Sequence, residues 1–143
     1  MALGLEWVER LSGSFSKPGA SSRQAPAALL LRAVVPDLAG VLRRRAEIVG
    51  TVRAPGLATF GSVVGVVTRS PGFVARYALD LVADDGTPLS LVLEKRGFGR
   101  DLYAAATTVV GQARDPAGGV VATLALRVDV RGGKLVSDVR FRG

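Results

Sequence analysis

Apolar and polar residues alternate with a period of two from residue 27 to the end of the chain, and turn residues interrupt the alternation about every ten positions. Successive side chains of an extended strand point to opposite faces, so this alternation indicates strands with one buried and one exposed face. The pattern predicts eight strands, at residues 27–35, 45–53, 57–68, 73–83, 88–97, 102–112, 119–130 and 134–142.

Glycine, proline and aspartate mark most of the breaks between these strands, as in Asp84-Asp85-Gly86. Connections this short can join only antiparallel neighbours. One longer link, residues 36–44, has leucine and valine at helical spacing after a proline and predicts a turn or two of helix. A flat sheet of eight sequential strands would expose its edges, and closure removes them. We therefore predict an all-β, eight-stranded antiparallel up-and-down β-barrel.

The first 26 residues have a different pattern. Residues 12–26 are rich in serine, glycine and proline and predict a flexible tether. Before them, Leu3, Trp7 and Leu11 recur at every fourth position, which predicts a short amphipathic helix. Such a helix would form a flap that lays Trp7 across an opening, and a frayed terminus is the alternative. This interpretation divides the chain into a helix or flap with its tether (1–26) and a barrel domain (27–143).

Two of the predicted strands, 57–68 and 102–112, are apolar on both faces. Because exposed apolar surface commonly marks an interface, something should cover their outer sides. The N-terminal segment, the helix at 36–44 and a second copy of the chain, in a homodimer, are the three candidates.

The amino-acid composition of this 143-residue chain excludes several classes of catalytic and metal site. The chain has no cysteine and no histidine, which excludes thiolate nucleophiles, imidazole bases and nearly every zinc site, and we expect neither a metal nor a cofactor. The formal net charge of +7 keeps nucleic acid among the candidate partners. The arginines, however, are spread over outward strand positions without interleaved aromatic residues, so a solvated basic surface is the better interpretation.

No segment of the chain predicts contact with a membrane. The longest stretch without a charge, residues 54–68, is shorter than the roughly 20 apolar residues of a membrane-spanning helix. The N-terminus has two glutamates among its first ten residues and no cationic lead into an apolar run, so it does not resemble a secretory signal. We expect a cytoplasmic protein.

The size of the side chains at inward positions indicates whether the barrel interior is hollow or filled. Many are small, such as Ala46, Gly50, Ala75 and Ala122, while Tyr77 is large. This composition predicts a partly hollow apolar interior that binds an apolar small molecule, with a packed core as the alternative. Large inward residues also include Phe73, Phe141 and either Tyr103 or Phe60. The residues expected to line the ligand site are Trp7, Phe73, Leu79, Leu91, Leu93, Tyr103, Leu124, Leu126 and Phe141.

Tyr77 and Lys95 are the candidate catalytic residues. The Tyr77 hydroxyl is a neutral donor well placed for a ligand carbonyl. Lys95 shares its parity with Leu91 and Leu93, so it faces inward if they do, and the alternative is a rim residue with its ammonium group in water. Glu94 has the opposite parity, which argues against a Glu-Lys pair inside the cavity.

Five short segments, within a span of about 60 residues, carry a resemblance to known proteins: Ile48-Val-Gly-Thr-Val52, Tyr77-Ala-Leu79, Asp84-Asp85-Gly86, Leu91-Val-Leu-Glu-Lys95 and Thr107-Thr108. In these segments the chain resembles the lipocalin-like (calycin-type) β-barrel domains of actinobacteria that occur alone or beside cholesterol-oxidase-type flavoenzymes. The resemblance implies a calycin-like barrel that binds a lipid, sterol or polyketide. The chain has no flavin-binding portion, which puts the link with oxidases in doubt.

The chain is also similar, at the level of the fold, to the small barrel cyclases of polyketide tailoring, including those that promote [4+2] cycloadditions. Ring closure of this kind needs no histidine, cysteine or metal, because holding a flexible precursor in its reactive conformation can supply much of the acceleration. The leading hypothesis is therefore a cyclase that acts on a polyketide-type natural-product precursor. A non-catalytic carrier of a lipid, sterol or polyketide is the alternative.

Overall fold

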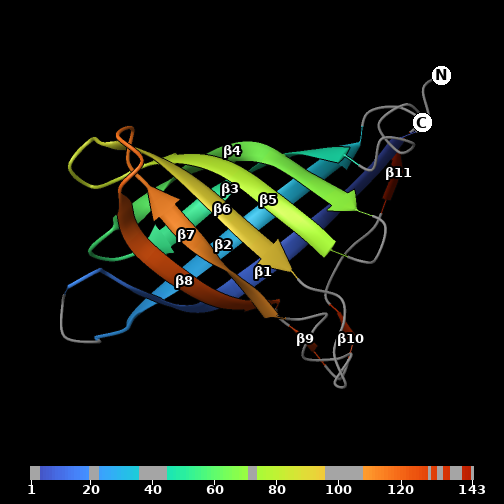
Figure 1. Ribbon diagram of the computed structural model, residues 1–143. Helices are drawn as coiled ribbons and strands as arrows, with labels where there is room; N and C mark the ends of the chain where they lie inside the picture. Colours follow the sequence, from blue (N-terminus) through green and yellow to red (C-terminus); the bar gives the residue numbers. More distant parts are fainter. Residues whose placement is uncertain are drawn as a thin grey trace.

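Eight long strands form a closed, all-antiparallel β-barrel (Figure 1). The computed structural model describes residues 4–19, 23–35, 45–70, 74–95, 108–128, 130–131, 134–135 and 140–142. Neighbours in sequence are neighbours in the sheet, and β1 also pairs with β8, which closes the barrel. The strands are β1 (Gly4–Ser16), β2 (Ala25–Val35), β3 (Arg45–Ala54), β4 (Ala58–Ser70), β5 (Val74–Val82), β6 (Pro88–Lys95), β7 (Thr108–Arg114) and β8 (Val120–Val128). This is the predicted fold class and the up-and-down order.

The N-terminal segment is a wall of the barrel, so the prediction of a helix there is wrong. Residues 5–15 pair with β2 along their whole length, and residues 11–16 pair with β8. A spacing of four residues is also a multiple of two, so Trp7 and Leu11 share one face of a strand as readily as one face of a helix. The serines at 12 and 14 alternate with Gly13 and the buried Phe15, so this run is strand and not tether.

The barrel closes through β1, which pairs with β8. The sequence instead predicts residues 134–142 as the eighth and last strand of the barrel. The C-terminal segments are short: β9 (Val130–Arg131) pairs with β10 (Lys134–Leu135) in a separate two-stranded sheet. The last, β11 (Arg140–Arg142), pairs with residues 4–6 and extends the wall beyond β8. Because β1 is 13 residues long, it can pair with β8 along its second half and with β11 at its start.

The other predicted strands are confirmed. Those from 27–35 to 88–97 correspond to β2 through β6, and 119–130 corresponds to β8. The strand predicted at 102–112 overlaps β7, which spans Thr108–Arg114, and its first six residues, 102–107, lie outside the described residues. The helix predicted at 36–44 lies outside the described residues. No helix in the described part of the chain is long and apolar enough to cross a membrane.

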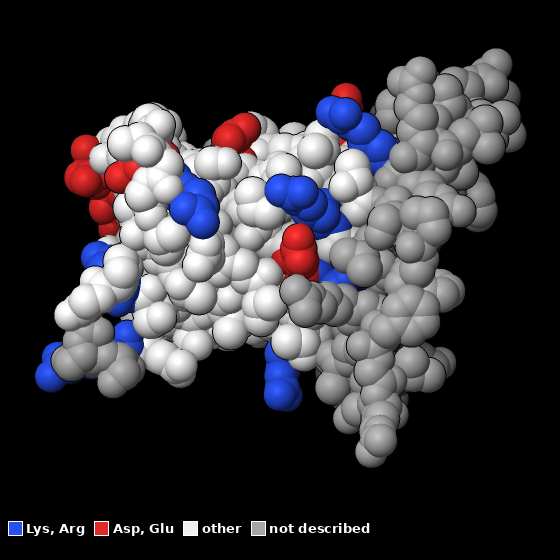
Figure 2. All heavy atoms as spheres, in the orientation of Figure 1, with Lys and Arg blue, Asp and Glu red and all other residues white. Residues whose placement is uncertain are grey.

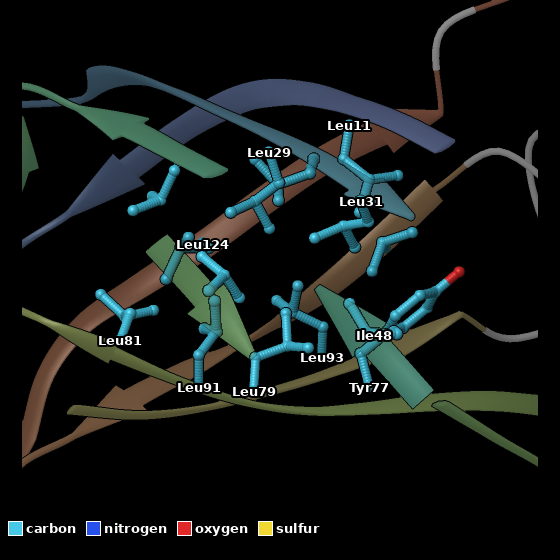
Figure 3. Packing of buried hydrophobic residues seen from close by; sticks show 14 of the residues in the cluster. Leu11, Leu29, Leu31, Ile48, Tyr77, Leu79, Leu81, Leu91, Leu93 and Leu124 are labelled. Carbon is cyan, nitrogen blue, oxygen red and sulfur yellow. The ribbon is translucent and has the colours of Figure 1, made fainter. Parts of the chain in front are cut away.

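Leucines occupy much of the barrel interior. Leu11 of β1 and the buried leucines of β2, Leu29 and Leu31, point toward Leu79, Leu91 and Leu93 of β5 and β6 (Figure 3). Leu31, Leu79 and Leu93 are at most 1% exposed. The inward alternation of β3, β5, β6 and β8 is thus confirmed, and these rows belong to one hydrophobic core cluster. The partly hollow interior inferred from the small inward residues stays a prediction.

Glycines at inward positions let the strands approach each other closely enough to close a small barrel. A Cβ atom on Gly65 would lie 2.0 Å from the carbonyl oxygen of Ala78, and one on Gly50 would lie 2.1 Å from that of Leu30. Glycine in a strand permits such an approach because it has no side chain. Each of these glycines faces a leucine across the ladder, and the same holds for Gly13 and Gly111; the pairs are Gly13 with Leu126, Gly50 with Leu31, Gly65 with Leu79, and Gly111 with Leu93.

Short hairpin turns gather at one end of the barrel, here called the turn end. They join β3 to β4, β5 to β6 and β7 to β8, and each contains a glycine with positive φ. Asp84 joins two of these turns, since its carboxylate accepts hydrogen bonds from the Thr59 backbone N–H at 2.8 Å and the Thr59 hydroxyl at 2.7 Å. These two bonds lower the pKa of Asp84 below its ordinary value. Phe15 and Leu57 are buried near these turns.

The outer surface carries charges of both signs. On the face that Figure 2 shows, basic and acidic side chains are interspersed and separated by uncharged surface. Phe60, which the sequence left as a possible inward residue, is 69% exposed and lies outside, where the Arg53 guanidinium sits 5.9 Å from its ring centroid. Val64 on β4 and Val110 on β7 are also exposed, in agreement with the prediction that these strands are apolar on both faces.

Candidate functional site

A buried carboxylate lies among the aliphatic side chains of the barrel interior. Glu9 is 8% exposed and is the one buried residue with a charged side chain among those that the structure describes. It lies on the inner face of β1, between Trp7 and Leu11, and opposite Leu31 of β2. Removing a carboxylate from water is costly unless hydrogen bonds compensate for the lost hydration, so its position needs a physical explanation.

Two neutral donors hold Glu9. The Tyr77 hydroxyl donates to Oε2 at 2.6 Å, and the Trp7 indole N–H donates to Oε1 at 3.3 Å. Tyr77 is 2% exposed and belongs to β5. Because β1 and β5 are opposite walls of an eight-stranded barrel, the hydrogen bond between Glu9 and Tyr77 crosses the lumen.

The two hydrogen bonds differ in quality. A distance of 2.6 Å is short for a bond between two oxygens and is typical of a charge-assisted one, whereas 3.3 Å lies at the long end for a nitrogen donor. A carboxylate has about four lone-pair sites in all. Oε2 therefore accepts a strong hydrogen bond, and Oε1 keeps most of its capacity to accept further hydrogen bonds.

The site lies toward the end opposite the turn end, where β1 and β5 begin. Buried alanines occur in both halves of the interior: Ala33, Ala46 and Ala75 lie in this half, and Ala27, Ala54, Ala58, Ala113 and Ala122 lie toward the turn end. The feature that sets this half apart is the buried carboxylate of Glu9 with its two donors.

Tyr77 faces inward as predicted, but its hydroxyl group already donates a hydrogen bond to Glu9. A phenol has one O–H to donate, and in this structure Glu9 receives it. The predicted role, donation to a ligand carbonyl, would require the hydroxyl to leave Glu9. That role remains a prediction.

Lys95 lies at the end of β6, in register with Ala75 on one side and Val109 on the other. It has the same parity as Leu91 and Leu93, which are buried, and it is itself half-buried. This position fits a residue near the rim of the barrel, on the same half as Glu9. Its assignment as a catalytic residue remains a prediction.

The residues predicted to line a ligand site fall into three groups. Trp7 is half-buried and packs against the core from β1. A second group is buried in the interior as expected: Leu79, Leu91, Leu93, Leu124 and Leu126. The side chains of Phe73, Tyr103 and Phe141 lie outside the described part of the structure.

Outside the barrel, an open depression of about 450 Å³ lies over β1, β2 and β3. Its lining includes Val8, Leu30, Arg32, Val49 and Gly50. Arg32 forms an ion pair with Glu6, which raises the pKa of the guanidinium. Among the described residues, no three acidic side chains gather where they could hold a metal ion.

Glu9 is not among the site residues predicted from the sequence. Under the helical interpretation, Glu9 falls on the polar side of the helix, away from Trp7 and Leu11. The same residues arranged as a strand put Trp7, Glu9 and Leu11 on one inward face. A charged residue at an inward position of a strand was the signal that could have identified it.

Comparison with protein-family models, curated proteins and solved structures found no match to this chain. The closed eight-stranded antiparallel barrel is consistent with a lipocalin-like barrel, so the resemblance seen in the sequence is supported at the level of architecture. A small β-barrel is compatible with the binding of one small ligand.

Proposed function

We propose that this protein binds an apolar small molecule in the half of the barrel that contains Glu9 and Tyr77, and that it is a cyclase acting on a polyketide-type precursor. The hydrogen bond between Glu9 and Tyr77 across a mainly apolar barrel interior carries the proposal. Polar groups held inside an apolar pocket are typical of sites that orient a ligand.

The reaction we propose is a redox-neutral ring closure within one linear chain. The Glu9 carboxylate takes the proton of a substrate hydroxyl or activated C–H, and the resulting oxygen or carbon attacks the β-carbon of an enone in the same molecule. The electron pair moves to the carbonyl oxygen as an enolate, and the proton returns from Glu9 to the α-carbon. Atoms and charge balance without a cofactor.

The remaining residues have supporting roles in this mechanism. The aliphatic wall holds the chain folded so that its two ends meet, which removes much of the entropic barrier to ring closure. Tyr77 orients Glu9 through its 2.6 Å hydrogen bond. Lys95, at the rim of the same half, is proposed to stabilise the developing enolate oxygen.

A [4+2] cycloaddition by conformational templating is the variant of this proposal that needs no proton transfer. It depends on the shape of the lumen and not on the base. The Glu9→Gln variant separates the two reactions, because it should stop the proton-transfer ring closure and leave a cycloaddition largely intact.

The test uses two linear substrates, a hydroxy-enone and a triene ketone, with product formation followed by chromatography and mass spectrometry. We expect the protein to accelerate at least one ring closure over buffer, and expect Tyr77→Phe and Lys95→Met to lower turnover by about ten-fold or more. Val64→Ala, on the outer face of β4, is the matched control and should keep full activity. If neither substrate reacts faster than in buffer, the cyclase proposal fails.

A carrier is the second candidate function, favoured by the largely aliphatic residues of the barrel interior, which suit an apolar ligand. A carrier needs affinity and no reacting group. Binding of N-phenyl-1-naphthylamine, a neutral apolar fluorophore, without turnover of either substrate would support the carrier. Mass spectrometry of the intact protein under native conditions, after purification from its producing strain, would identify a retained molecule directly.

A further inference from the structure

We infer that the ligand presents a hydrogen-bond donor, an ammonium or hydroxyl group, to Oε1 of Glu9. This inference rests on the proposed binding of an apolar molecule beside Glu9 and Tyr77 and specifies which polar group that molecule carries. The site, as the structure describes it, offers the ligand an acceptor.

The first argument is the unequal use of the two carboxylate oxygens. Oε2 receives the short bond from Tyr77, and Oε1 receives only the long bond from Trp7. Oε1 therefore has a weakly used acceptor site in a place where water is largely excluded. A ligand donor at Oε1 would gain a charge-assisted hydrogen bond at a low local dielectric.

The second argument is the direction of the Tyr77 hydroxyl. Since Tyr77 gives its proton to Glu9, a ligand carbonyl placed here would meet lone pairs on the Glu9 carboxylate. A carbonyl or carboxylate ligand would have to break this 2.6 Å hydrogen bond before it could accept one from Tyr77. An alcohol or an amine needs no such exchange.

The third argument is the position of Trp7. Its indole lies two residues from Glu9 on the same inward face and is half-buried, so it can contact the ligand next to the polar group. An aromatic face beside a carboxylate suits a cationic or polar head with an alkyl body, because the ring attracts the cation and the carboxylate neutralises it. Trp7 is also the only tryptophan of the chain, so its fluorescence reports on this site alone.

The experiment compares four ten-carbon probes that share an alkyl chain and differ in the head: 1-decanol, decylamine, 2-decanone and decanoate. The first two donate hydrogen bonds, and the last two only accept them at neutral pH. Binding to the full-length protein is measured by Trp7 fluorescence and by displacement of N-phenyl-1-naphthylamine. We expect decylamine and 1-decanol to bind about ten-fold or more tightly than decanoate and 2-decanone, a typical gain for one good hydrogen bond to a charged group.

The Glu9→Gln variant should lose this preference, with all four affinities falling within about three-fold of each other. Glu47→Gln, which changes an exposed acid on the outer face of β3, is the control and should keep it. Circular dichroism and the thermal transition establish that both variants are folded. If Glu9→Gln does not fold, the double variant Glu9→Leu/Tyr77→Phe takes its place, and the donor preference should be lost there as well.

Equal affinity for all four probes in the wild-type protein, or a preference for decanoate or 2-decanone, would overturn the inference and leave the proposed ligand binding in place. A donor preference that survives Glu9→Gln would also overturn it, because the donor would then be recognised elsewhere. Failure of all four probes and of the fluorophore to bind would instead contradict the proposed function itself.

Discussion

At the scale of single residues, Glu9 is the feature that stability alone does not explain. A leucine at the same position would extend the aliphatic wall, whereas a buried carboxylate must be compensated by hydrogen bonds from Trp7 and Tyr77. Replacement of buried polar groups by apolar ones of similar size is often neutral or stabilising. A protein that keeps the carboxylate despite this is expected to use it.

The hydrogen bond between Glu9 and Tyr77 gives a prediction about stability. Tyr77→Phe removes the donor and leaves a buried carboxylate short of one bond, so we expect a loss of about 1.5–3 kcal/mol in the free energy of unfolding. In the double variant Glu9→Leu/Tyr77→Phe neither partner is left unsatisfied, and its stability should equal or exceed that of the wild type. Urea denaturation of the wild type, both single variants and the double variant measures this coupling. Additive effects would contradict the prediction.

At the scale of the strand, alternation and glycine placement together explain the curvature of the wall. The inward leucines and the glycines paired with them have different roles. The leucines supply buried apolar area, and the glycines let the neighbouring strand approach closely. On β4, Gly65 and Gly61 both face inward, but their surroundings differ. A Cβ atom on Gly65 would lie 2.0 Å from the Ala78 carbonyl oxygen, whereas one on Gly61 would meet nothing closer than Val52 Cγ1 at 3.7 Å.

These two glycines make a matched pair for a test of strand approach. Gly65→Ala should push β4 and β5 apart and cost about 1–3 kcal/mol or more, because the backbone cannot move aside without breaking ladder hydrogen bonds. Gly61→Ala should change the stability by less than about 0.5 kcal/mol. Urea unfolding of both variants, with near-ultraviolet circular dichroism of the aromatic residues, gives the comparison. Equal effects at the two positions would show that close approach is not what selects glycine at residue 65.

At the scale of the whole molecule, β1 decides whether the sheet is open or closed. It pairs with β2 on one side and with β8 on the other, so both of those strands would become edges without it. It also supplies Trp7 and Glu9, so barrel closure and the candidate site depend on the same 13 residues.

Removal of residues 1–16 therefore should not leave a folded barrel domain. We expect the shortened chain to aggregate or to lose the dispersed amide signals of a folded protein in NMR spectra, because the β2 and β8 edges are exposed together with the leucine interior. As a control, a Gly-Ser insertion between Pro18 and Gly19, both exposed in the link after β1, should leave the fold intact. A stable, monomeric chain beginning at residue 17 would contradict the role assigned to β1.

Alternation and turn residues are local signals, and they are sufficient to predict the all-β class, most strand positions and the inward facing of Tyr77, Leu79, Leu91 and Leu93. Closure of the barrel by β1 depends on long-range pairing, because β1 and β8 join residues that are more than a hundred positions apart. The same closure brings Glu9 within hydrogen-bonding distance of Tyr77 on the opposite wall, 68 residues away in sequence. No local pattern carries that contact, since it depends on strand register around the whole barrel.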